Sequence, residues 1–246
     1  MHYINADGPY ECYCLMENIG WMKNIRFREY QEWLRTLSKD QMVEAYRFHK
    51  LQMQLILLAR GNGIMNNYMD HEQQLVFKEA SHAMNLEAIL EAYPDALFIQ
   101  TYRDPCASTA SLGSLCEVFM VTLGYSPENI DLARLGQDIL RSSQVHGGNE
   151  MARFRKGHPE EEYRFCDIKY EDIVASPLNV VRKIYSFFGL TLTALGVAKM
   201  TAYVEKHPQN KYGRHKYALK RYKLTEEDVM EQHKEFVEFS KARGLL

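Results

Sequence analysis

The chain lacks the long apolar run that a transmembrane helix requires. Nowhere do its 246 residues approach the ~18 continuous apolar side chains that cross a bilayer. Its first residues, Met1 to Gly8, also lack the apolar segment of a secretory signal peptide. We therefore expect a cytoplasmic protein with no membrane partner.

The sequence has no strong excess of charge of either sign. Lysine and arginine number 30 against 32 aspartates and glutamates, so the formal net charge is -2. A balance of this kind gives no general attraction to nucleic acid or to an anionic membrane. A binding site for a polyanionic ligand would have to be a local cluster of basic side chains.

Cysteine is scarce and irregularly spaced, and repeats and low-complexity tracts are absent. The five cysteines have neither zinc-site spacing nor the density of a disulfide scaffold, so we interpret them as ordinary thiols and expect no metal. A Walker-type phosphate loop is missing too, because the glycine pairs at 61/63 and 147/148 precede no Lys-Ser or Lys-Thr. This absence disfavours a nucleotide kinase. The cysteines are Cys12, Cys14, Cys106, Cys116 and Cys166.

One stretch combines a buried strand with the start of a helix. Residues 96–102 form a short apolar, β-prone run, typical of a strand that is buried on both faces of a parallel sheet. Arg103 ends this run, Asp104 can cap a helix, and Pro105 suits the first helical position. The pattern predicts a strand, an arginine and a helix N-terminus in immediate succession.

Two hydroxyl side chains follow on the same helix. At helical spacing, Ser108 and Ser111 lie on one side of the segment that begins at Asp104. Backbone N–H groups, the positive end of a helix dipole and the Arg103 guanidinium then converge at the carboxyl end of a strand, which favours a phosphate or sulfate site. The alternative is that Arg103 pairs with a nearby carboxylate and Ser108 caps its own helix.

The rest of the chain alternates strand and helix signals, which predicts an α/β fold with a parallel sheet flanked by helices. Further strands are expected at 75–78 and 163–168. Helices are expected at 29–37, 39–60, 82–92, 105–123, 126–156 (with a break at Gly147 and Gly148), 177–188, 193–206 and 225–243. The segment 126–156 carries five basic residues, most of which we interpret as a solvated face: Arg134, Arg141, Arg153, Arg155 and Lys156.

The amino-acid sequence around these elements is similar to that of a known family. Tyr93-Pro-Asp-Ala-Leu-Phe-Ile-Gln-Thr-Tyr-Arg-Asp-Pro105 and Asp167-Ile-Lys-Tyr-Glu-Asp-Ile-Val-Ala-Ser-Pro177 resemble the sulfotransferases that use 3′-phosphoadenosine 5′-phosphosulfate (PAPS). The resemblance implies a single domain over residues 1–246 with a P-loop nucleotide-kinase-like fold. It also implies a helical insertion at about 27–62 and sulfuryl transfer from PAPS to a hydroxyl or amine.

The resemblance assigns the nucleotide to the carboxyl ends of the strands. It implies that Arg103 and Ser111 bind the 3′-phosphate, assisted by Arg214 and Lys216 from a basic, glycine-containing loop. It implies that Tyr170 packs on the nucleotide or hydrogen-bonds it. The alternatives are a core role for Tyr170 and a solvated loop at Arg214 and Lys216.

The resemblance also assigns the chemistry. Phe77-Lys-Glu-Ala-Ser-His82 stands where the family has Leu-Lys-Ser-Pro-x-His. By this match Lys78 steadies the transferring sulfuryl group, and His82 is the general base for the acceptor hydroxyl. Glu79 departs from the pattern, and a carboxylate is unfavourable beside an anionic donor. The alternative is that His82 caps a helix or lies on the surface.

The family's first strand and its 5′-phosphosulfate loop have no match in the sequence. We therefore expect a fold without that N-terminal strand, and a catalytically inactive nucleotide-binding or interaction protein is the alternative function. The acceptor is expected to be a small molecule or a glycan, and a homodimer is compatible with these expectations.

Overall fold

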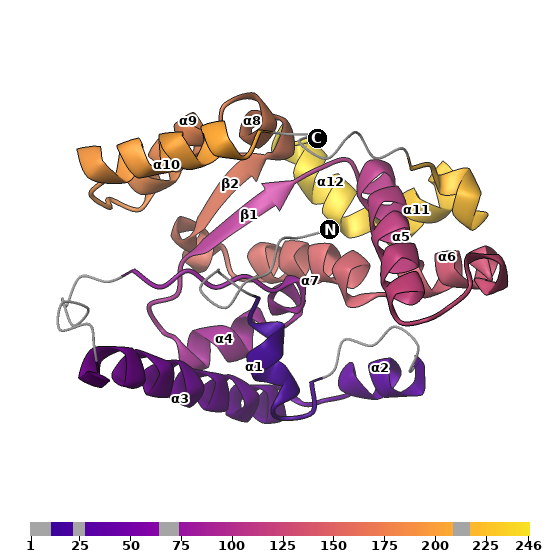
Figure 1. The fold of residues 1–246 in the computed structure, drawn as a ribbon, viewed down its shortest axis with the longest axis horizontal. Helices are drawn as coiled ribbons and strands as arrows, with labels where there is room; N and C mark the ends of the chain where they lie inside the picture. Colours follow the sequence, from indigo (N-terminus) through magenta and orange to yellow (C-terminus); the bar gives the residue numbers. More distant parts are fainter. Residues whose placement is uncertain (1–10, 22–27, 64–73, 209–216) are drawn as a thin grey trace. The chain divides into compact units, whose positions relative to one another are not determined.

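The computed structural model describes residues 11–21, 28–63, 74–208 and 217–246. Contacts between residues divide the chain into two compact units, residues 1–96 and residues 97–246. The expected single domain over 1–246 stays a prediction. Within the described segments, every helix is too short or too polar to cross a membrane. Figure 1 labels the helices and strands.

The first unit is helical. A long helix, α3, packs against the shorter α4. A capping box opens α3: the Gln41 N–H donates to Ser38 Oγ (3.2 Å), and the Ser38 N–H donates to Gln41 Oε1 (2.9 Å). The unit's elements are α1 (Tyr13–Glu17), α2 (Arg28–Leu34), α3 (Lys39–Gly63), the 3₁₀ turn η1 (Ala80–Met84) and α4 (Leu86–Ala92).

The prediction of a strand at 75–78 is wrong, because these residues form no strand in the structure. The Cys12 N–H donates to the Lys78 carbonyl oxygen (3.0 Å), but this one bond does not make a ladder, and Val76 is 81% exposed. The helix expected from His82 starts later as well. Glu79 caps the η1 turn by accepting from the Ser81 N–H (2.9 Å), and α4 begins only at Leu86.

The second unit contains a small parallel sheet and most of the helices. Its elements are β1 (Phe98–Tyr102), α5 (Pro105–Thr122), η2 (Pro127–Asn129), α6 (Leu132–Leu140), α7 (Ser143–Gly157), η3 (Pro159–Arg164), β2 (Phe165–Lys169), α8 (Tyr170–Ala175), α9 (Pro177–Phe187), α10 (Ala194–Lys206), η4 (Leu219–Tyr222), α11 (Glu226–Gln232) and α12 (Lys234–Ala242). This composition confirms an α/β class, although the described residues are mostly helical.

The sheet lies between two helical layers (Figure 1). β1 and β2 pair in parallel from Phe98 opposite Phe165 to Tyr102 opposite Lys169. On one face Tyr102 packs into a core with α7 and α12. On the other face Cys166 packs with residues of α8 and α9.

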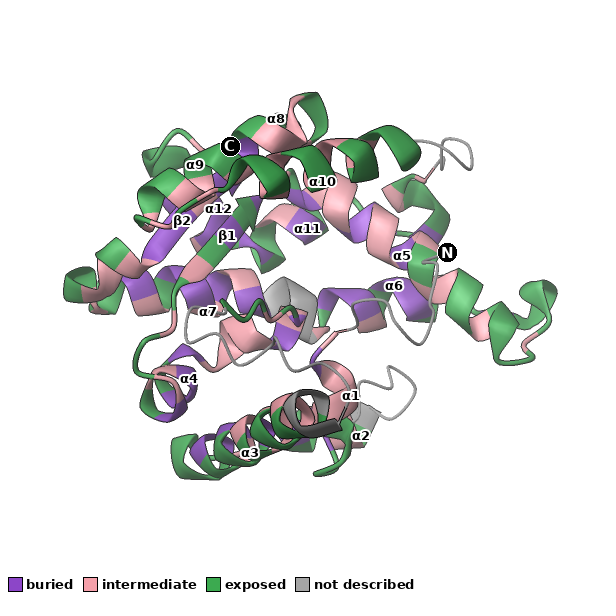
Figure 2. Ribbon diagram, turned by 60° about the vertical axis from the view of Figure 1, so that its left-hand side comes forward, coloured by how far each residue is buried: buried purple, intermediate pink, exposed green. Residues whose placement is uncertain are grey.

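The expectation that the 96–102 strand is buried on both faces is wrong. Ile99 is 46% exposed, whereas its partner across the ladder, Cys166, is fully buried. The reason is that α8 and α9 pack on Cys166 and Ile168 of β2 and leave Ile99 on β1 partly open. Figure 2 shows the difference, because β2 is largely purple while β1 carries green residues.

Tyr222 is inserted between α5 and α6 at two glycines. A Cβ atom at Gly113 would lie 2.4 Å from the Tyr222 ring, and one at Gly136 would lie 2.2 Å from the Tyr222 carbonyl oxygen. Both distances are far below van der Waals contact, so only glycine admits the segment. The Tyr222 hydroxyl also donates to Glu117 on α5.

The long helices expected at 126–156 and 225–243 are each divided. The first break falls at Arg141 and Ser142, between α6 and α7, not at the glycine pair. Gly148 lies inside α7, where a Cβ atom would come within 3.2 Å of the Phe236 ring, so this glycine serves close packing against α12. The second break falls at His233, between α11 and α12, although the Thr225 capping box that opens α11 is confirmed.

Arg155 is buried, so it is an exception to the solvated face that we expected for most of the basic residues in 126–156. Its side chain is 0% exposed and forms ion pairs with Glu162 and Asp167. Its Nη1 also donates to Gln100 Oε1 (2.8 Å) and to Tyr102 Oη (2.9 Å) on β1. The guanidinium thus joins both strands to α7 and η3.

We expect Arg155→Ala to lower the free energy of unfolding by about 3–5 kcal/mol, because it removes the buried cation that pairs with Asp167 and donates to Gln100 and Tyr102. Urea titration followed by circular dichroism measures this change. Arg153→Ala is the control on the same helix: Arg153 is 52% exposed, and its loss should cost less than ~1 kcal/mol. A loss for Arg155→Ala no larger than the control would contradict the role of this network.

Candidate anion site at the strand ends

The carboxyl ends of β1 and β2 bring two predicted site residues together. Arg103 directly follows β1, and Tyr170 directly follows β2. Because the register pairs Tyr102 with Lys169, the next residue on each chain lies at the same edge of the sheet. Open α/β sheets bind ligands at this edge.

The Arg103 side chain has aromatic and hydroxyl partners. Its guanidinium carbon lies 4.3 Å from the centroid of the Tyr170 ring, and Nη2 donates to Tyr217 Oη over 2.6 Å. Within the described segments, no carboxylate lies at ion-pair distance from Arg103. The alternative that Arg103 merely pairs with a carboxylate therefore finds no support there. The side chain is half-buried, and no acidic group of the described residues neutralises its charge.

The helix N-terminus beside Arg103 forms as the sequence predicts. Asp104 Oδ1 accepts from the Ala107 N–H (2.6 Å), and Pro105 occupies the first turn of α5. Asp104 caps the helix and Ser108 does not. The alternative that Ser108 caps its own helix is therefore wrong. Ser108 and Ser111 lie one turn apart on α5, and both are half-buried. The predicted Arg214 and Lys216 lie outside the described residues.

His82 belongs to the first unit and contacts the long helix. Its Nδ1 lies 3.0 Å from Tyr46 Oη, and its ring is half-buried. Burial, helped by the charge of Glu79, raises the pKa of Tyr46, so this hydroxyl keeps its proton. The phenol therefore holds one ring nitrogen of His82, Nδ1.

A second histidine, His49 on α3, packs with His82 and nearby aromatic rings. His49 Nδ1 lies 2.7 Å from Tyr93 Oη, and its ring packs edge-on against Phe77 and His82. Burial lowers the pKa of His49, which therefore stays neutral near physiological pH and adds no charge beside His82. No site role was predicted for Tyr46 or His49 from the sequence. Their spacing of three positions on one helix face is the signal that was available.

Lys78 is exposed and already has a partner. Its ammonium group forms an ion pair with Glu11, and 70% of the lysine side chain is accessible. The structure thus gives Lys78 a carboxylate partner, in contrast to Arg103.

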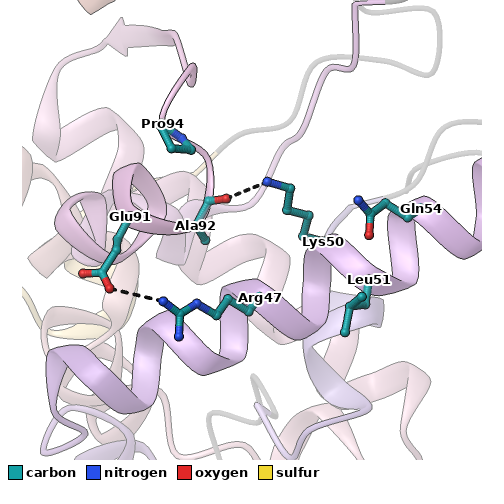
Figure 3. A pocket seen from close by; sticks show the side chains of 7 residues that line it. All are labelled: Arg47, Lys50, Leu51, Gln54, Glu91, Ala92 and Pro94. Atoms are coloured by element: carbon teal, nitrogen blue, oxygen red, sulfur yellow. Dashed lines mark hydrogen bonds and ion pairs between the residues drawn. The ribbon is translucent and has the colours of Figure 1, made fainter.

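The first unit also has a surface hollow of about 420 Å³ (Figure 3). Its cations are engaged, since Lys50 Nζ donates to the Ala92 carbonyl (3.0 Å) and Arg47 pairs with Glu91. None of the predicted site residues lines this hollow, so the hollow gives no support for a reaction there. Within the described segments, no group of three or more His, Cys, Asp and Glu side chains could hold a metal ion. The hollow is lined by Arg47, Lys50, Leu51, Gln54, Glu91, Ala92 and Pro94.

Comparison with known proteins decides the family. The profile described as "Sulfotransferase family" matches residues 1–194. The chain belongs to the sulfotransferase family. This family membership agrees with the resemblance in the amino-acid sequence around Arg103 and Tyr170.

Related sulfotransferases are longer. The omega-hydroxy-beta-dihydromenaquinone-9 sulfotransferases Stf3 of Mycobacterium bovis and Mycobacterium tuberculosis are 22% identical over 173 residues, which is 68% of this chain and 40% of theirs. The chain thus spans less than half the length of these curated relatives.

Two solved structures share the fold. Sulfotransferase STF9 from Mycobacterium avium superposes with a TM-score of 0.76 at 25% identity, over 98% of this chain and 57% of its own. Sulfotransferase STF1 from Mycobacterium tuberculosis H37Rv gives 0.69 at 27% identity, over 95% of this chain and 56% of its own. The expected loss of an N-terminal strand relative to the family stays a prediction, as do the individual site roles.

We expect Tyr46→Phe to change the side-chain nitrogen and carbon chemical shifts of His82, because the variant removes the hydroxyl at Nδ1 and keeps the ring. Heteronuclear NMR of the imidazole measures the tautomer populations. Tyr93→Phe is the matched control, since its hydroxyl contacts His49 and not His82. Equal shifts of the His82 signals in the two variants would contradict a specific role for Tyr46.

Proposed function

We propose that this sulfotransferase-family chain transfers a sulfuryl group from PAPS to a hydroxyl or amine of a small-molecule or glycan acceptor. The observation that carries the proposal is the unneutralised Arg103 guanidinium at the carboxyl end of β1, over the Tyr170 ring and beside the N-terminus of α5. Family membership supports the choice of PAPS among phosphorylated ligands.

The donor set suits the 3′-phosphate of this nucleotide. An unpaired guanidinium supplies planar, charge-assisted hydrogen bonds, and the 18-residue α5 helix adds the positive end of its dipole. In this proposal Arg103 and Ser111 bind the phosphate, and Tyr170 packs against the nucleotide. Arg214 and Lys216 assist from the segment that precedes Tyr217.

Lys78 and His82 are proposed to serve the transfer itself. PAPS brings the activated sulfuryl group, whose charge lies on its peripheral oxygens, and a cation such as Lys78 stabilises that charge. The ion pair of Lys78 with Glu11 is exposed and worth only about 0–1 kcal/mol, so an anionic donor can displace the carboxylate. His82, held at Nδ1 by Tyr46, is proposed to take the acceptor's proton as general base.

Calorimetric titration with adenosine 3′,5′-bisphosphate, the product left after transfer, tests the binding half of the proposal. We expect the chain to bind it and Arg103→Ala to lose roughly 10- to 100-fold in affinity, since hydrogen bonds to charged groups are worth about 1.5–3 kcal/mol. Arg153→Ala, which removes an exposed arginine elsewhere on the second unit, should bind as the parent chain does. Unchanged affinity in a folded Arg103→Ala protein would refute the assignment.

Transfer from radiolabelled PAPS to a panel of alcohols and amines tests the catalytic half. His82→Asn keeps a polar group beside Tyr46 and removes the base, so we expect kcat to fall by about 100-fold or more while affinity for the bisphosphate is retained. If the parent chain binds the bisphosphate and transfers nothing to any acceptor, the alternative of a catalytically inactive nucleotide-binding relative is favoured.

A further inference from the structure

We propose that Tyr217 is a further binding residue for the 3′-phosphate: it positions the Arg103 guanidinium and donates its own hydroxyl proton to the same phosphate. This inference rests on the proposed function and deepens it. It adds a phenol to a subsite that the family resemblance describes through Arg103, Ser111 and two basic side chains of a loop.

The first step is the contact itself. Arg103 Nη2 donates to Tyr217 Oη over 2.6 Å, although the two residues are 114 positions apart in the sequence. The guanidinium lies over the Tyr170 ring at 4.3 Å, so one of its faces is covered. The guanidinium is thus held at one face and at one N–H, and among the described residues its other four N–H groups have no hydrogen-bond acceptor.

The second step is electrostatic. A phenol and an aromatic ring hold the guanidinium without cancelling its charge, whereas a carboxylate would both hold and neutralise it. Arg155, in the same unit, shows the other case, because its buried side chain is paired with Glu162 and Asp167. Arg103 has neutral partners among the described residues, so its charge stays available to an anion.

The third step concerns the hydroxyl proton. Tyr217 Oη accepts the hydrogen bond from Nη2, so its own O–H remains available as a donor. Among the described residues, no side chain or carbonyl lies within hydrogen-bond distance to accept it. A half-buried donor beside a cation fits an anionic oxygen, and a phosphate offers oxygens to both groups at once.

Tyr217→Phe tests the proposal, because it removes one oxygen and keeps the ring. We expect the affinity for adenosine 3′,5′-bisphosphate to fall roughly tenfold by calorimetric titration. The affinity for adenosine 5′-monophosphate, which lacks the 3′-phosphate, should not change. Tyr222→Phe is the matched control: it removes a hydroxyl bonded to Glu117 in the same stretch of chain, without touching Arg103, and should leave both affinities unchanged.

Two results would overturn the proposal. Equal losses for both nucleotides would show that Tyr217 is merely structural, and no loss for either would show that it does not contact the phosphate. If the parent chain does not prefer the bisphosphate, the proposed function fails instead. Inorganic pyrophosphate, with the Arg103 Nε–H signal followed by NMR, then tests Tyr217 alone: Tyr217→Phe must weaken this titration, and an unchanged titration refutes the role.

Discussion

The parallel pairing of β1 with β2 is the constraint on which the second unit depends. Its register sets Gln100 opposite Asp167, and Arg155 binds both of these residues from α7. The same register carries the two chains out of the sheet at Arg103 and Tyr170. One set of backbone hydrogen bonds therefore aligns the groups that bury one arginine and the groups that present another.

The two arginines show how the same side chain is adapted to opposite tasks. Arg155 is desolvated, and its burial is tolerable only because acidic and polar partners surround it. Arg103 keeps partial access to water and neutral partners, so its charge is available to a ligand. The difference lies in the partners that the fold supplies.

Local signals in the sequence predicted the local structure well. The caps at Ser38, Asp104 and Thr225 begin helices as expected, and the two strands that end at Arg103 and Tyr170 form the sheet. These features depend on a few adjacent residues and on the chemistry of caps, prolines and apolar runs. The juxtaposition of Arg103 with Tyr170 also followed, because parallel strands end at the same edge.

Long-range contacts could not be predicted in this way. The burial of Arg155 depends on partners on β1 and β2, and the contact of Tyr46 with His82 joins residues 36 positions apart. The missing strand at 75–78 fails for the same reason, since an apolar run needs a neighbouring strand that the local pattern cannot reveal. The roles of Lys78, His82 and Ser111 in the reaction remain predictions.

The wedge of Tyr222 between Gly113 and Gly136 has a consequence for how the protein matures. Tyr217 stands only five positions before this wedge, so its place beside Arg103 depends on the docking of the segment that starts η4. During synthesis, Arg103 emerges from the ribosome more than a hundred residues before Tyr217 does. The nascent chain therefore holds Arg103 without its phenol partner until the C-terminal segment has docked, so this contact is completed late.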